Sequence, residues 1–201
     1  PISYIARLLR ERGVGWWLPT ITTASAEDLL TAFTCCGRAL DADADLAASI
    51  PGLHLEGPYI SNVDGPRGAH GLEHVRLPDW DEVQRLDEAC GGRIRLVTLA
   101  PEVEGAVPFI KQCVAAGMVV AMGHTDLDRE SLARAVDAGA TLSTHLGNGA
   151  HDQLQRHNNY LWYQLAEERV YASFIADGQH LPRECLYSID RKSTRLNSSH
   201  L

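Results

Sequence analysis

The chain has 201 residues, 45% of them hydrophobic, and a formal net charge of −8 at pH 7. This length and composition suit a globular domain with a sizeable core. The excess of acidic residues argues against nucleic acid or an anionic membrane surface as the main partner. No apolar run in the sequence approaches the roughly 20 residues of a membrane-spanning helix.

The cysteines are odd in number and form no C-x-x-C pair, so we expect reduced thiols and a cytoplasmic protein rather than a disulfide framework. Two of them are adjacent in a predicted helix, where we expect them to pack in the core. The five positions are Cys35, Cys36, Cys90, Cys113 and Cys185.

Apolar residues at helical spacing predict a first helix from Ile2 toward Gly13. A second helix begins at Ser25, and residues 42–49 read as a small acidic connection. Asp79 is expected to cap a helix that runs to about Gly91. Further helices are predicted near 107–117, 130–139 and 162–168. The predicted strands cover residues 14–23, 50–56, 94–99, 118–122, 140–144 and 170–175.

The order strand, loop, helix is thus predicted six times. Such repeats build a parallel sheet, either doubly wound or closed as a (β/α)8 barrel. A barrel gathers the strand ends around one mouth, whereas an open sheet spreads them along a line. Because polar side chains follow successive strands, we favour a partial (β/α)8 barrel, although a complete one needs eight strands.

Three potential metal ligands stand at predicted strand ends. Glu56 ends the strand that Gly57 and Pro58 terminate, and an apolar run precedes both His124 and His145. Singly, each side chain is more typical of a solvated or hydrogen-bonded structural residue. Together, one carboxylate and two imidazoles form a set that binds a divalent metal. His54 shares a strand face with Glu56, and we expect it to support the ligands rather than join them.

Two segments do not fit the repeating pattern. Residues 62–75 form a long polar loop that contains His70 and His74, and loops of this kind are usually functional or disordered. Residues 191–201 show no apolar period, so we interpret them as a non-native tail after an incomplete barrel domain at 1–190.

Several short motifs, in order, resemble the N-acetylglucosamine-6-phosphate deacetylases of the amidohydrolase superfamily. They span roughly residues 2–187. The motifs are Leu18-Pro19-Thr20, His54-Leu55-Glu56-Gly57-Pro58, Gly68-Ala69-His70, Thr98-Leu99-Ala100-Pro101-Glu102, Gly123-His124-Thr125, Thr144-His145-Leu146 and Ala176-Asp177-Gly178-Gln179-His180.

The resemblance implies a (β/α)8 barrel beside a small β-sandwich, with this chain holding barrel strands two to seven. The family's catalytic aspartate lies on the eighth strand, so the general base is expected outside this sequence. Residues 97–102 contain no lysine, which fits the family's use of a glutamate ligand on strand three.

The resemblance also implies roles for individual residues. Glu56, His124 and His145 would hold the metal, expected to be zinc, with iron, manganese and cobalt as alternatives. His70 would contact the substrate carbonyl, and His180 would contact sugar hydroxyls.

Other positions match the family's phosphate contacts. Asn148 and Gly149 would contact the phosphate, and Arg156 would reach it across a dimer interface unless it is simply a solvated loop residue. The chain departs from the family here, because Gly147 replaces a bulky residue and Asn148-Gly149-Ala150 replaces Asn-Ala-Met.

The implied function is hydrolysis of N-acetylglucosamine 6-phosphate to glucosamine 6-phosphate and acetate, in amino-sugar catabolism. The alternatives are an amidohydrolase acting on an unphosphorylated or cyclic amide, and a non-catalytic fragment. We expect a homodimer in the full-length protein, and we expect residues 1–190 alone to be inactive because the barrel would not close.

Overall fold

The computed structural model describes residues 2–189, so the predicted tail at 191–201 lies outside the described residues. Its centre is a six-stranded parallel sheet. The strands are β1 (Thr20–Thr22), β2 (Leu53–Glu56), β3 (Ile94–Leu99), β4 (Val119–Met122), β5 (Leu142–Ser143) and β6 (Tyr171–Ala172). The helices are α1 (Ile2–Glu11), α2 (Ala26–Ala42), α3 (Ala44–Ser49), η1 (Leu72–His74), α4 (Trp80–Ala89), α5 (Ala106–Ala115), α6 (Arg129–Ala138) and α7 (Tyr160–Ala166).

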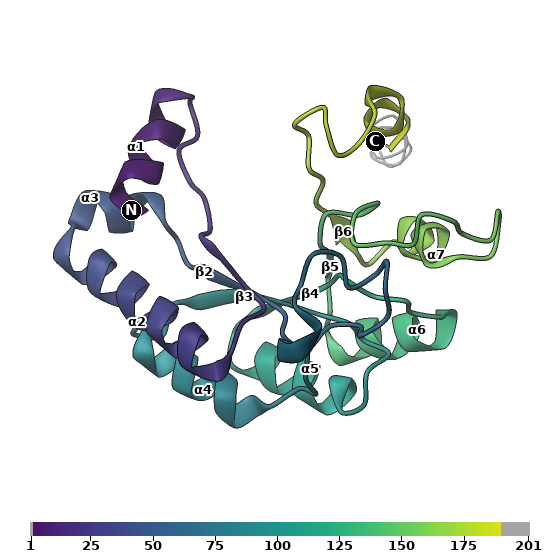
Figure 1. Cartoon of the computed structure of the whole chain (residues 1–201), viewed down its shortest axis with the longest axis horizontal. Coiled ribbons are helices and arrows are strands. Elements are labelled where there is room, and N and C mark those ends of the chain that lie inside the picture. Colours follow the sequence, from purple (N-terminus) through teal and green to yellow (C-terminus); the bar gives the residue numbers. More distant parts are fainter. Residues whose placement is uncertain (1, 190–201) are drawn as a thin grey trace.

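The strands pair in chain order, β1-β2-β3-β4-β5-β6, and each pair is parallel. A doubly wound sheet reverses its strand order at one point, whereas a barrel does not. The predicted α/β architecture is therefore confirmed in its barrel-like form, with strand pairing from β1 to β6 among the described residues. Helices α2, α4, α5 and α6 follow one another along the outer side of this sheet (Figure 1).

Side chains alternate between the two faces of each strand, which separates the residues that pack in the core from those on the opposite face of the sheet. Leu53 and Leu55 of β2 are fully buried in the main apolar cluster, together with Phe33 of α2 and Leu86 of α4. The alternate residues of β2 point to the opposite face, away from the helices. Burying β2 against α2 and α4 thus fixes which side chains face the inside of the sheet.

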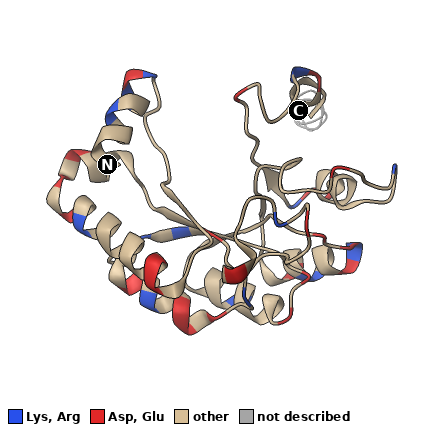
Figure 2. Cartoon of the chain, viewed as in Figure 1, with Lys and Arg blue, Asp and Glu red and all other residues tan. Residues whose placement is uncertain are grey.

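Charged residues lie mainly on the outer layer. Figure 2 shows acidic and basic residues interspersed along α2 and α4, whose inner faces pack in the core. Among residues 2–189, no helix combines the length and apolar character that a bilayer crossing requires.

Two predicted helix starts are confirmed by their caps. Ser25 Oγ accepts the N–H of Asp28 at 3.1 Å, and an Asp79 carboxylate oxygen accepts the N–H of Glu82 at 3.2 Å. The predicted connection at 42–49 was wrong. Asp43 caps α3 by accepting the N–H of Leu46 at 3.0 Å, so a short aspartate-capped helix formed where acidic composition suggested a loop.

Other differences concern the ends of strands and one cysteine. The strand predicted at 14–23 is confined to Thr20–Thr22, because Pro19 has no N–H to donate to a ladder. The strand predicted at 170–175 shortens to Tyr171–Ala172. Cys35 is exposed on α2, so its predicted core position was wrong, while Cys36 packs partly against the core.

A partly buried ion pair between Arg76 and Glu82 holds the end of the 62–75 loop. The Arg76 guanidinium donates to both carboxylate oxygens of Glu82, at 2.7 and 3.0 Å, and Tyr59 donates to Glu82 at 2.8 Å. Arg76 also donates to the backbone carbonyls of Ala24 and His74, at 3.0 and 2.7 Å. One side chain therefore connects this loop, the segment after β1 and α4.

We expect Glu82→Gln to lower the free energy of unfolding by about 2 kcal/mol, because it leaves Arg76 without its buried counter-ion. The matched control is Asp41→Asn, which removes an ion pair to Arg93 whose aspartate side chain is 67% exposed. That change should cost less than about 1 kcal/mol. Urea unfolding of the full-length protein, followed by circular dichroism, compares the two, and equal losses would contradict the prediction.

Candidate metal centre

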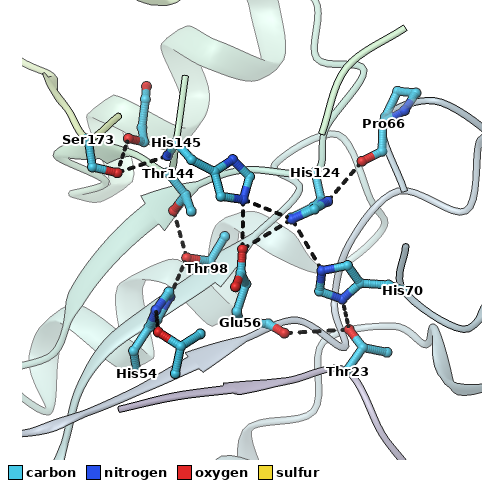
Figure 3. Close-up of polar contacts among 12 residues, drawn as sticks. Thr23, His54, Glu56, Pro66, His70, Thr98, His124, Thr144, His145 and Ser173 are labelled. Atoms are coloured by element: carbon cyan, nitrogen blue, oxygen red, sulfur yellow. Dashed lines mark hydrogen bonds and ion pairs between the residues drawn. The ribbon is translucent and has the colours of Figure 1, made fainter. Parts of the chain in front are cut away.

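The three predicted ligands lie at one edge of the sheet. Glu56 is the last residue of β2, while His124 and His145 each stand two residues beyond the end of a strand, β4 and β5. Parallel strands in sequential order bring their carboxyl ends together. Figure 3 shows the three side chains pointing toward one another from these separate strands.

The donor atoms form a compact cluster. Oε1 of Glu56 lies 3.1 Å from Nε2 of His124 and 2.8 Å from Nε2 of His145, and the two nitrogens are 3.0 Å apart. All three atoms lie within 4.8 Å of one another. One carboxylate and two imidazoles at this spacing suit a divalent cation such as zinc.

The tautomer of His124 also fits a metal ligand. Its Nδ1 lies 3.0 Å from the backbone carbonyl oxygen of Pro66. A carbonyl oxygen only accepts, so Nδ1 carries the hydrogen and Nε2 presents its lone pair to the cluster. Metal-binding histidines are typically held in this way. His145 receives a different support, because the hydroxyl of Ser173 accepts its backbone N–H at 2.8 Å.

Both histidines have left-handed backbone conformations, with φ of 51° at His124 and 33° at His145. Such conformations are uncommon outside glycine and cost about 1–3 kcal/mol each. The surrounding fold supplies this energy at two neighbouring strand ends. Strain concentrated in this way is typical of functional sites.

Burial and charge act in opposite directions on Glu56. Burial by itself would raise the pKa of its carboxyl group, but hydrogen bonds and charge from the protonated forms of His124 and His145 lower it further than burial raises it. The net pKa is well below the ordinary value, so the carboxylate is ionised at neutral pH. An ionised carboxylate is the form that binds a cation.

His54 lies beneath the cluster and belongs to a separate hydrogen-bonded chain. Its Nδ1 lies 3.0 Å from the hydroxyl of Thr20, and its Nε2 lies 2.7 Å from that of Thr98. Thr98 in turn contacts the hydroxyl of Thr144 at 2.7 Å. Burial lowers the pKa of His54 to about 4, against a smaller opposing effect of Glu56. A neutral imidazole thus joins the strands that present Glu56 and His145.

Two glycines leave room for the His124 ring. A Cβ at Gly149 would lie 2.8 Å from its Nδ1, and a Cβ at Gly68 would lie 3.3 Å from its Cε1. Both glycines have positive φ, of 56° and 59° respectively. The loops at 62–75 and after β5 therefore close over this imidazole from different parts of the chain.

Sequence comparison finds relatives that are named as amino-sugar-6-phosphate deacetylases. No family model matches the chain. An N-acetylgalactosamine-6-phosphate deacetylase from Shewanella sp. is 34% identical over 174 residues, covering 86% of this chain and 42% of that protein. An N-acetylglucosamine-6-phosphate deacetylase from Bacillus subtilis is 32% identical over 181 residues, covering 89% of this chain and 45% of that protein.

Comparison with solved structures also finds deacetylases of this kind. N-acetyl-D-glucosamine-6-phosphate deacetylase from Mycobacterium smegmatis is 35% identical, with a TM-score of 0.77, and the match covers 88% of this chain and 45% of that one. The Thermotoga maritima enzyme has a TM-score of 0.81 at 27% identity, covering 94% of this chain and 50% of that one.

This chain is a homologue of the amino-sugar-6-phosphate deacetylases. It spans less than half the length of the curated relatives given above. The sequential parallel sheet is the corresponding part of the deacetylase barrel.

The residues that the deacetylase resemblance assigns to substrate lie in different surroundings. His70 is close to the cluster, with its Nε2 3.2 Å from Nε2 of His124. Gly149 packs on His124, and the adjacent Asn148 has a buried Nδ2 without a hydrogen-bond partner among residues 2–189. His180 and Arg156 are exposed, and no hydrogen bond within the described part of the chain connects them to the three ligands.

Sequence reasoning missed the groups that orient the histidines. These are the Pro66 carbonyl, the Ser173 hydroxyl and the hydroxyl of Thr23, which lies 2.6 Å from Nδ1 of His70. Thr23 and Ser173 directly follow β1 and β6, so attention to every strand end would have found them. A backbone carbonyl such as that of Pro66 has no signature in the sequence.

We expect Gly149→Ala to weaken zinc binding about tenfold or more, because the new Cβ displaces the His124 ring from the Pro66 carbonyl. Gly178→Ala is the matched control, since Gly178 also has a positive φ, of 76°, but nothing lies within 4 Å of its added Cβ. Chelator competition on the full-length protein measures both affinities. Equal losses would assign the effect to backbone strain instead.

The buried His54 predicts a pH dependence of stability. The folded imidazole has a pKa of about 4 against an ordinary value of 6.5, so the unfolded state binds more protons between these values. The free energy of unfolding should therefore fall as pH drops from 6.5 to 4, by up to about 3 kcal/mol.

In the variant His54→Gln, the free energy of unfolding should depend less steeply on pH between 6.5 and 4 than in the wild type, whatever the variant's stability at neutral pH. The exposed His157, replaced in the same way, is the control. Urea unfolding with a chelator present removes any contribution from metal release. An unchanged slope in His54→Gln would show that His54 is not the group responsible.

Proposed function

We propose that the protein containing this chain is a metal-dependent deacetylase of an N-acetylhexosamine 6-phosphate, N-acetylglucosamine 6-phosphate first. The observation that carries the proposal is the cluster of Glu56, His124 and His145 with His70 against it. A mutant of the Mycobacterium smegmatis enzyme has been solved in complex with N-acetyl-D-glucosamine-6-phosphate, at 36% identity and a TM-score of 0.78.

In this proposal Glu56, His124 and His145 hold one divalent ion, with zinc preferred because imidazole and carboxylate ligands suit it. A bound ion of this kind polarises an amide carbonyl and lowers the pKa of water toward about 7. Glu56 supplies the negative charge, and the Pro66 carbonyl keeps the lone pair of His124 directed inward.

His70 would bind the carbonyl oxygen of the acetyl group. Burial and the neighbouring His124 lower its pKa to about 4, so the ring is neutral at physiological pH. A neutral imidazole donates one hydrogen bond, which strengthens as negative charge develops on the oxygen. By resemblance, an aspartate on a further strand takes the proton from water and passes it to the leaving nitrogen.

The phosphate would be recognised by the loop after β5. The buried Nδ2 of Asn148 is a donor without a partner among the described residues. Arg156 adds a planar cation, which would reach the substrate phosphate bound in the second subunit of a homodimer. Because relatives with both the gluco and the galacto name match this chain, the configuration of the sugar is left to experiment.

The location proposed for the enzyme is the cytoplasm. All five cysteines are free thiols, and Cys90 and Cys113 are buried. Reduced cysteines in this number are typical of a reducing compartment.

The full-length protein, loaded with zinc, should release acetate faster from N-acetylglucosamine 6-phosphate than from unphosphorylated N-acetylglucosamine. N-acetylgalactosamine 6-phosphate serves as the third substrate. Equal rates with and without phosphate would remove the phosphate specificity and favour a general amidohydrolase, in keeping with the altered sequence at 147–150. No acetate release from any of them would remove the deacetylase function.

Glu56→Gln should lose bound zinc and at least about a hundredfold in activity, because a neutral amide replaces the ligand carboxylate. The control is Glu73→Gln, a loop glutamate whose side chain is 72% exposed. Metal content by elemental analysis and acetate release are measured on the same samples. Full zinc content in Glu56→Gln would contradict the ligand assignment.

A further inference from the structure

Thr23 follows β1 directly and has no part in the proposed ligand set, yet its hydroxyl makes the shortest polar contact of His70. Oγ1 of Thr23 lies 2.6 Å from Nδ1 of His70 and 3.5 Å from the carbonyl oxygen of Glu56 (Figure 3). A hydroxyl has one hydrogen to donate. The shorter contact is the stronger candidate for that hydrogen.

The opposite side of the His70 ring leads to the same assignment. Nε2 of His70 lies 3.2 Å from Nε2 of His124, whose own hydrogen is on Nδ1 because Nδ1 faces the Pro66 carbonyl. In the proposed site the lone pairs of Glu56, His124 and His145, 2.8–3.1 Å apart, share one cation, but His70 lies outside this set. A bare Nε2 on His70 would therefore face the lone pair of His124 with no cation between them. The contact is favourable when Nε2 of His70 carries the hydrogen, which leaves Nδ1 as an acceptor for Thr23.

The protein also keeps space for this hydroxyl. A Cβ at Gly57 would collide with Oγ1 of Thr23, and Gly57 has a φ of 73°, which glycine adopts without strain. Gly57 directly follows Glu56, so the turn that ends β2 places the backbone carbonyl oxygen of Glu56 3.5 Å from the Thr23 hydroxyl.

We infer that Thr23 is a positioning residue, whose hydroxyl donates to Nδ1 of His70 and fixes the tautomer with its hydrogen on Nε2. The resulting chain runs in one direction, from Thr23 to His70 to His124 to the carbonyl of Pro66. The inference rests on the proposed function in one respect: when the lone pair of His124 serves as a ligand, the Nε2 hydrogen of His70 is available to the substrate carbonyl.

The opposite tautomer would have a different chemical consequence. A hydrogen on Nδ1 would leave a lone pair on Nε2, and His70 would then be a fourth ligand rather than a donor to substrate. Thr23 therefore separates two roles for the same imidazole. A donor role needs the threonine hydroxyl, whereas a ligand role would need only an acceptor at that position.

The test uses the full-length protein with ¹⁵N-labelled histidine, where long-range ¹H–¹⁵N spectra distinguish a protonated from a bare ring nitrogen. Wild type and Thr23→Ser should both show His70 protonated on Nε2. Thr23→Ala, and the nearly isosteric Thr23→Val, should show a mixture that includes the Nδ1 tautomer. Protonation on Nδ1 in the wild type, or an unchanged tautomer in both hydroxyl-free variants, would overturn the inference.

Kinetics on zinc-loaded samples provide the second readout. Thr23→Ser should retain kcat within about threefold, while Thr23→Ala and Thr23→Val should lose about ten- to a hundredfold in kcat with unchanged zinc content. Equal kcat in the serine and alanine variants would overturn the role of the hydroxyl. An inactive wild type would instead refute the proposed function, and the spectra would still decide the tautomer.

Discussion

The carboxylate of Glu56 is the group on which the rest of this site depends. It carries the negative charge around which two imidazoles converge, and it is ionised in spite of its burial because those rings favour the charged form. Its position follows from β2, whose leucines pack against the outer helices and so turn His54 and Glu56 inward. The packing of the core and the chemistry of the site therefore both follow from the alternation of side chains between the two faces of β2.

Much of this arrangement could be predicted from the sequence because it is periodic or local. The ladder of parallel strands, the cluster of Glu56, His124 and His145 at their ends and the caps at Ser25 and Asp79 each rest on a short pattern. The lengths of the strands were harder to predict, since Pro19 and the pairing with neighbouring strands decide where the hydrogen-bonded ladder ends. Helix α3 was missed because its aspartate cap resembles the composition of a loop.

The supporting contacts could not be predicted, since they join segments that no local pattern connects. The loop at 62–75 was recognised as unusual, but nothing in its sequence shows that the Pro66 carbonyl reaches His124 or that Arg76 ties the loop to α4. The direction of the His54 side chain was anticipated, whereas its partners, Thr20 and Thr98, come from the register of three adjacent strands.

The proposed ligands come from distant parts of the chain, with Glu56 separated from His124 by 68 residues and from His145 by 89. An unfolded chain pays a large entropic cost to gather such distant groups, so a cation held by the proposed ligands would bind the folded state in preference to the unfolded chain. Metal availability then enters the folding equilibrium by mass action. Above the dissociation constant, each tenfold rise in free metal adds about 1.4 kcal/mol to the stability of the folded protein. If the proposed site binds the metal, a cell that limits the metal would thereby lower the amount of folded protein.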